Sequence, residues 1–119
     1  MTKRDPIDCI EDILKYSRDI LAISKNLSKQ EFTSNIEKQY SLLHCIEVIG
    51  EATKRLLSIS PDFRSNYPMI DWKSIVGMRD ILIHHYEEAN QDIVWDTIQK
   101  DIPKLEKDFT QILAQVIGK

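Results

Sequence analysis

The stretch "VWDTIQKDIPKLEKDFTQILAQVIGK", residues 94–119, carries the clearest signal of the fold class. Its apolar residues recur every three or four positions, which is the spacing of the buried face of an amphipathic helix. These residues are Val94, Ile98, Ile102, Leu105, Phe109, Ile112 and Val116. Pro103 falls inside the pattern. Because proline has no backbone N–H to donate, we expect it to bend this helix or to divide it into two pieces.

The same helical period recurs in two segments nearer the N-terminus. The first covers about residues 5–26, on Ile7, Ile10, Leu14, Ser17, Leu21 and Ser24. A second helix should follow, and two capping boxes compete for its start. Ser28 precedes Glu31, and Ser34 precedes Glu37, by the three residues that such a box requires.

Residues 60–72, "SPDFRSNYPMIDW", contain two prolines and predict the one long loop of the chain, so the second helix should end near Ile59. Asp71 can then cap a third helix. Trp72 begins that helix as a core anchor, and Trp95 has the same role at the start of the last one. Four long helices with short links predict an all-α, antiparallel bundle of four to five helices.

Length and composition fit a single domain over residues 1–119. Hydrophobic residues make up 42% and charged residues 29%, as in globular proteins, and no apolar run approaches the roughly 20 residues of a membrane span. The N-terminus has no signal-peptide pattern, so we expect a cytoplasmic protein with Cys9 and Cys45 as buried free thiols. The net charge of −3 means that any RNA contact needs a local basic patch, for which Thr53–Arg55 and Lys73 are candidates.

Polar residues cluster in "GMRDILIHHY", residues 77–86, on the predicted third helix. Arg79 and Tyr86 fall on one side of that helix, whereas His84 lies about 140° from Arg79 and one turn after Asp80. Asp80 can accept a hydrogen bond from His84 and favour its protonated form, which would suit a general acid or base. The same pair can also be ordinary surface support near a helix C-terminus. Spacing alone leaves both interpretations open.

This cluster resembles the motif of the HepT-like branch of the HEPN (higher eukaryotes and prokaryotes nucleotide-binding) superfamily. That motif is an arginine, four to six residues, a histidine, any residue and a tyrosine, and it is filled here by Arg79, His84 and Tyr86. Three longer segments are also similar to the family: "IGEATKRL", "IDWKSIVGMRD" and "DIVWDTIQKDIPKLEKDF". The resemblance covers about residues 8–112. Two residues depart from the commoner pattern, Asp80 in place of asparagine and His85 in place of glycine.

The resemblance implies a HEPN-like bundle that dimerises and acts as the toxin of a toxin–antitoxin pair. Such toxins are metal-independent endoribonucleases without a cofactor, and the substrate would be an RNA such as tRNA or mRNA. Arg79 and His84 would be catalytic, with both chains contributing to one cleft, and Asp80 would support them. RNA cleavage of this kind needs a base for the 2′-hydroxyl proton, a cation over the phosphate and an acid for the leaving oxygen. Histidine and arginine can supply these groups.

The family also implies a protein partner. A minimal nucleotidyltransferase serves as the cognate antitoxin and inactivates the toxin by adenylylating the motif tyrosine, which is Tyr86 here. An alternative is a non-catalytic, nucleotide-binding helical partner of a nucleotidyltransferase, in which the motif only presents Tyr86. The net charge of −3 suits this alternative, because it gives no general attraction for RNA.

Overall fold

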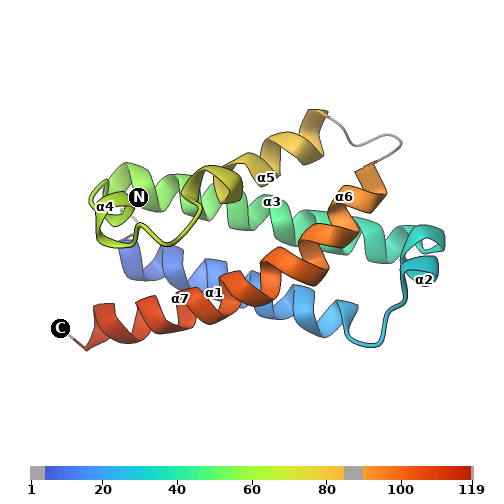
Figure 1. Ribbon diagram of the computed structural model, residues 1–119, viewed down its shortest axis with the longest axis horizontal. Coiled ribbons are helices and arrows are strands. Elements are labelled where there is room, and N and C mark those ends of the chain that lie inside the picture. The colour runs from blue at the N-terminus through green and yellow to red at the C-terminus, as the bar shows by residue number, and fades with distance from the viewer. Residues whose placement is uncertain (1–4, 85–89, 119) are drawn as a thin grey trace.

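The computed structural model describes residues 5–84 and 90–118, and every regular element in these ranges is helical. Four long helical segments run alternately in opposite directions (Figure 1): α1 (Pro6–Ser24), α3 (Ile36–Ile59), α5 (Trp72–His84) and the continuous path of α6 (Asn90–Asp96), η1 (Thr97–Asp101) and α7 (Ile102–Ile117). Two short helices lie in the connections, α2 (Lys29–Ser34) and α4 (Phe63–Asn66). The predicted all-α antiparallel bundle is confirmed.

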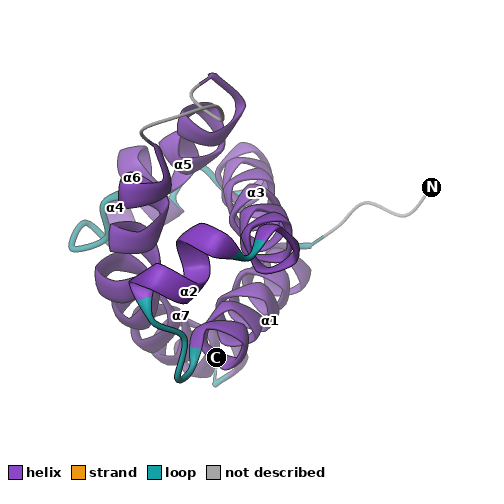
Figure 2. Ribbon diagram, turned by 90° about the vertical axis from the view of Figure 1, so that its right-hand side faces the viewer, coloured by secondary structure: helices purple, strands orange, loops and turns teal. Residues whose placement is uncertain are grey.

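Seen end-on, the long helices form a ring in which α3 lies between α5 and α1, and α1 lies between α3 and α7 (Figure 2). The core fills this ring with buried side chains that include Ile10, Ile13, Ile20, Leu42, Ile46, Ile49, Leu56, Ile98, Ile102 and Phe109. Cys9 and Cys45 are buried and neither forms a disulfide, as predicted. No helix in the described ranges combines the length and apolarity needed to cross a bilayer.

Three side-chain hydroxyls are buried in the core, and each donates a hydrogen bond. Ser17 donates to the Leu14 carbonyl at 3.0 Å, and Thr53 donates to the Ile49 carbonyl at 2.8 Å. Ser24 donates in the same way to the carbonyl four residues before it, at 2.7 Å. Because each hydroxyl bonds a carbonyl of its own helix, these polar residues can occupy positions of the apolar face.

Two helices occupy the region where the sequence predicts one. The hydroxyl of Ser28 accepts a hydrogen bond from the Glu31 backbone N–H, and the Glu31 carboxylate accepts one from the Ser28 N–H, each at 3.1 Å. This complete capping box starts α2 and lowers the pKa of Glu31. The alternative box at Ser34 and Glu37 is wrong, because α3 begins after Asn35, whose side chain accepts a backbone N–H at 3.1 Å.

The predicted loop at residues 60–72 contains one further helical turn, α4. Phe63 in this turn is buried and stacks on Tyr67, with ring centroids 5.4 Å apart. A single turn is too short to show a period in the sequence, so the prediction of an uninterrupted loop is wrong at this point.

The last helix divides next to Pro103, as predicted. In η1 the backbone widens to a π-helical turn, and the Ile102 N–H donates to the Thr97 carbonyl five residues earlier instead of four. Pro103 then falls in the first turn of α7, where its missing N–H removes no hydrogen bond. The change of register therefore places the proline at a helix start without ending the helical path.

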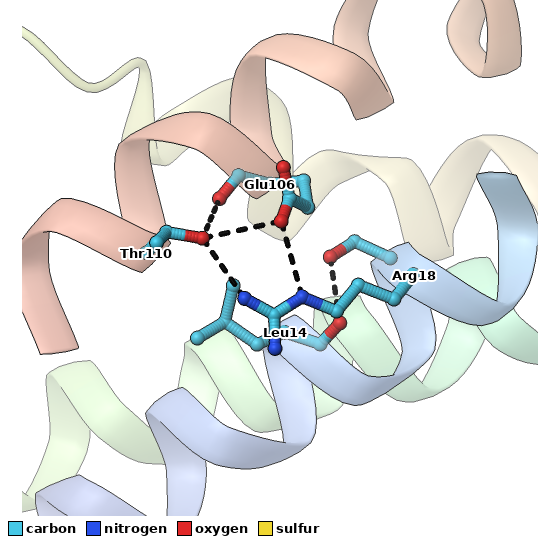
Figure 3. A network of polar contacts seen from close by, with 5 residues as sticks. Leu14, Arg18, Glu106 and Thr110 are labelled. Atoms are coloured by element: carbon cyan, nitrogen blue, oxygen red, sulfur yellow. Dashed lines mark hydrogen bonds and ion pairs between the residues drawn. The ribbon is translucent and has the colours of Figure 1, made fainter.

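Arg18 of α1 forms hydrogen bonds to α7 on the surface of the bundle (Figure 3). Its Nε donates to Glu106 Oε1, and its Nη2 donates to Thr110 Oγ1, both at 3.1 Å. The Thr110 hydroxyl donates in turn to the Glu106 carbonyl at 2.8 Å. The Arg18 side chain is 54% exposed, and exposed ion pairs contribute roughly 0–1 kcal/mol, so the network mainly sets the register of the two helices.

Candidate functional site

The first turn of α5, the helix that carries the predicted site, is capped by Asp71. Its carboxylate accepts hydrogen bonds from the Ser74 backbone N–H at 3.1 Å and from the Ser74 hydroxyl at 2.7 Å. The predicted cap is therefore confirmed. These hydrogen bonds stabilise the ionised form and hold the pKa of Asp71 below its ordinary value.

Trp72 joins the start of α5 to the rest of the bundle, which confirms the predicted anchor. The side chain is 4% exposed, and its indole Nε1 donates to the Tyr67 carbonyl at 3.0 Å. The ring meets Phe63 and Phe109 edge-on, with centroids 6.4 and 5.8 Å apart. Because Phe109 belongs to α7, this contact fixes the separation of α5 and α7 at one end of the helix.

Three of the predicted site residues occupy the second half of α5. Arg79 and His84 are five residues apart, which separates their positions by about 7.5 Å along the axis and about 140° around it. Asp80 stands one turn before His84. Tyr86, the predicted modification site, lies outside the described residues. Positions 79 and 84 therefore lie on different sides of one helix.

A groove of about 600 Å³ lies beside the first half of α5. The residues of α5 form one wall, and residues of α6, η1 and α7 form the other. The buried side chains that line it are apolar: Ile70, Ile75, Met78 and Leu105. Its charged residues are Lys73, Lys100, Lys104, Asp71, Asp96, Asp101 and Asp108. Since Met78 is part of the wall, the groove reaches the residue before Arg79.

Of the candidates for a basic patch, Lys73 lines this groove. Lys54 and Arg55 are exposed on α3 instead. Sequence reasoning missed Lys100, which η1 contributes to the opposite wall. The one feature of the sequence that pointed to Lys100 is its position three residues before Pro103, where the helix was expected to bend or divide. Within the described residues, no group of three or more His, Cys, Asp and Glu side chains is arranged to hold a metal ion.

The all-α bundle and the Arg-x4-His-x-Tyr sequence that begins on α5 define a HEPN-like helical protein. The chain belongs to the family described as "Ribonuclease HepT-like", whose model matches residues 10–112.

Three relatives show how far this similarity extends. The chain is 41% identical over 119 residues to "Putative RNase MJ1216" of Methanocaldococcus jannaschii, covering 100% of this chain and 96% of that protein. It is 36% identical over 112 residues to "Putative RNase TTE0752" of Caldanaerobacter subterraneus, covering 94% and 97%. It is 32% identical over 110 residues to "Probable ribonuclease HepT" of Thermococcus cleftensis, covering 92% and 97%. No solved structure matches this chain significantly.

Proposed function

We propose that this chain is the toxin of a toxin–antitoxin pair and cleaves RNA as a metal-independent endoribonuclease. The observation that carries the proposal is the pair Arg79 and His84, which occupies adjoining turns of α5 in a chain whose relatives are named ribonucleases. An arginine can bind two oxygens of one phosphate, and a histidine can exchange a proton near neutral pH. Together they match what cleavage of a phosphodiester requires.

The angle between positions 79 and 84 supports a homodimer as the active form. About 140° of helix separates them, so one α5 helix does not place both on one phosphate. A two-fold axis close to α5 would bring two copies of each residue around one cleft. The proposed dimer is therefore a requirement of the chemistry.

The cleavage step would use these groups as follows. One His84 removes the proton of the RNA 2′-hydroxyl, and the 2′-oxygen attacks the adjacent phosphorus. The bond from phosphorus to the 5′-oxygen breaks, and His84 of the second copy gives that oxygen a proton, leaving a 2′,3′-cyclic phosphate and a 5′-hydroxyl. Arg79 binds the non-bridging oxygens as negative charge accumulates there. Asp80, one turn before His84, would orient the imidazole.

The proposed off switch is Tyr86. A minimal nucleotidyltransferase antitoxin would transfer AMP to its hydroxyl, which attaches a phosphodiester with one negative charge close in sequence to Arg79. That charge would compete with the RNA phosphate for the guanidinium, and the adenosine would occupy space that the substrate needs. The support for this step is the Arg-x4-His-x-Tyr sequence itself.

The test is cleavage of purified tRNA and mRNA in the presence of a metal chelator. His84→Ala and Arg79→Ala should each lower the rate by about 10²–10⁴-fold, the usual loss for a positioned acid–base group, while retaining wild-type circular dichroism. His85→Ala is the matched control and should keep most of the activity. Light scattering should report a dimer for all four proteins. Wild-type protein that is adenylylated but cleaves no RNA would instead support the non-catalytic partner of a nucleotidyltransferase.

A further inference from the structure

We propose that the groove beside α5 binds the RNA strand next to the cleaved phosphate, with Lys73 and Lys100 holding phosphates from its two walls. This inference rests on the proposed ribonuclease function and adds the path of the nucleotides that flank the cleavage point. Lys73 lines the wall formed by α5, and Lys100 lines the wall formed by η1. A strand lying between the walls would meet one lysine on each side.

Most of the other charges around the groove are already engaged within the chain. Lys104 and Asp108 form an ion pair at 2.8 Å. Asp71 accepts two hydrogen bonds from Ser74 as the cap of α5. The charge of Asp108 is therefore offset by Lys104, whereas the Asp71 carboxylate stays ionised.

The groove lining carries three lysines and four aspartates, so the positions of Lys73 and Lys100, and not the net charge, would hold an anion there. Asp96 interacts electrostatically with Lys29, a lysine outside the groove. Asp92 raises the pKa of Lys29, and Asp96 raises it more weakly. Among the described residues, Lys73 and Lys100 form no ion pair. Each lysine could therefore bind one phosphate, in a lining that also contains Asp96, Asp101 and the Asp71 carboxylate, which interacts electrostatically with Lys73.

Gly77 gives the α5 wall an open surface. A glycine inside a helix is about 1 kcal/mol less favourable than alanine, yet a Cβ added at Gly77 would meet no atom of the described residues within 4 Å. Packing among the residues that the structure describes therefore gives no reason for a glycine here. By helical register, position 77 shares a face with Lys73 one turn earlier and His84 two turns later. A glycine at this point lets a sugar–phosphate backbone approach the helix closely between Lys73 and the proposed site.

The size and lining of the groove also fit flanking nucleotides. Its volume of about 600 Å³ lies within the range of about 300–1,000 Å³ typical of ligand pockets. The apolar residues Ile75, Met78 and Leu105 offer a surface for a base or a ribose. Lys73 stands six residues before Arg79, or about 9 Å along the helix axis, which places it at a neighbouring phosphate and not at the scissile one.

The experiment measures binding separately from cleavage. A short fluorescein-labelled single-stranded RNA with 2′-O-methyl groups cannot be cut, because the attacking hydroxyl is blocked. Fluorescence anisotropy at several salt concentrations should show that Lys73→Gln and Lys100→Gln each weaken binding several-fold. Each should also lower the slope of log Kd against log salt by about 0.7, the value for one phosphate contact on a single strand. Lys107→Gln, an exposed lysine of α7 that does not line the groove, is the matched control and should change neither quantity.

A second variant tests the shape of the groove without changing its charge. Gly77→Leu should retain the helix, because leucine is the better helix former, and should weaken RNA binding by filling the α5 wall. Asp101→Asn should tighten binding, because it removes one negative charge from the groove lining. Wild-type affinity and salt slope in both lysine variants would overturn the inference, as would failure of the wild-type protein to bind the RNA.

The outcomes for the groove and for the ribonuclease activity are distinguishable. Cleavage that depends on His84, together with unchanged binding in the groove variants, would refute only the groove. Loss of binding in the groove variants of a protein that cuts no RNA would support the groove and refute the proposed function. A changed oligomeric state in Gly77→Leu with unchanged RNA affinity would identify the groove as a protein interface and overturn the inference.

Discussion

Replacing Trp72 by phenylalanine should destabilise the bundle by about 2 kcal/mol. The indole Nε1 donates to the Tyr67 carbonyl at 3.0 Å, and loss of such a hydrogen bond removes about 1 kcal/mol. The smaller ring also leaves a void between Phe63 and Phe109, because Trp72 is only 4% exposed, and a void of this kind costs on the order of 1 kcal/mol. A loss of this size is a substantial part of the roughly 5–15 kcal/mol that stabilises a typical domain.

Urea denaturation followed by far-ultraviolet circular dichroism measures this loss, and Trp95→Phe is the matched control. Trp95 is only partly buried, against Phe32 at 5.5 Å between ring centroids. In the described part of the chain its indole makes no hydrogen bond, so its replacement should cost less than about 1 kcal/mol. Equal losses in the two variants would refute the assignment of Trp72 as the anchor of α5.

Two further predictions concern Tyr86 and Asp71. Tyr86→Phe should stay active as a ribonuclease and should not be adenylylated on co-expression with the cognate nucleotidyltransferase. Intact-mass spectrometry measures the added AMP, and AMP on the variant would place the modification at another residue. The pKa of Asp71 is lowered in the folded state, so the stability that its cap contributes is present above its ordinary pKa of 3.8 and is lost as the pH falls through the lower folded value. Asp71→Ala should therefore be less stable than wild type near neutral pH. Urea titrations at decreasing pH should show the free energies of unfolding of the two proteins converging in acid. A difference that does not change with pH would contradict the role of Asp71 as a helix cap.

The long helices could be predicted from the sequence because each buries one continuous face. Most residues of the apolar period of α1 and α7 are buried, including Ile10, Leu14, Phe109 and Ile112, whereas Ile36 and Tyr40 at the start of α3 are 59% and 51% exposed. The boundary between α2 and α3 could not be predicted in this way. Ser34 and Asn35 are both good caps, and the choice between them depends on where the Ser34 hydroxyl finds a carbonyl inside α2.

The candidate site was predictable in its motif and not in its surroundings. Arg79, Asp80 and His84 follow one another along a single helix, so their spacing determines their relative positions. Lys100 belongs to a different segment, and its place opposite Lys73 depends on the wider turn of η1. Pro103 predicts an interruption of the helix but not its form, since a kink, a break and a π-helical turn all accommodate a proline.

The one-sided packing of α5 affects the order in which parts of the bundle open. This helix packs along α3 and meets α7 through Trp72, whereas α1 is enclosed between α3 and α7. In a single chain, backbone amides of α5 should therefore exchange with solvent through a local opening that leaves the rest of the bundle intact, whereas amides of α1 should exchange only on global unfolding. A ligand that fills the groove would close this route and slow exchange in α5 alone, so the stability of a single helix would report on binding.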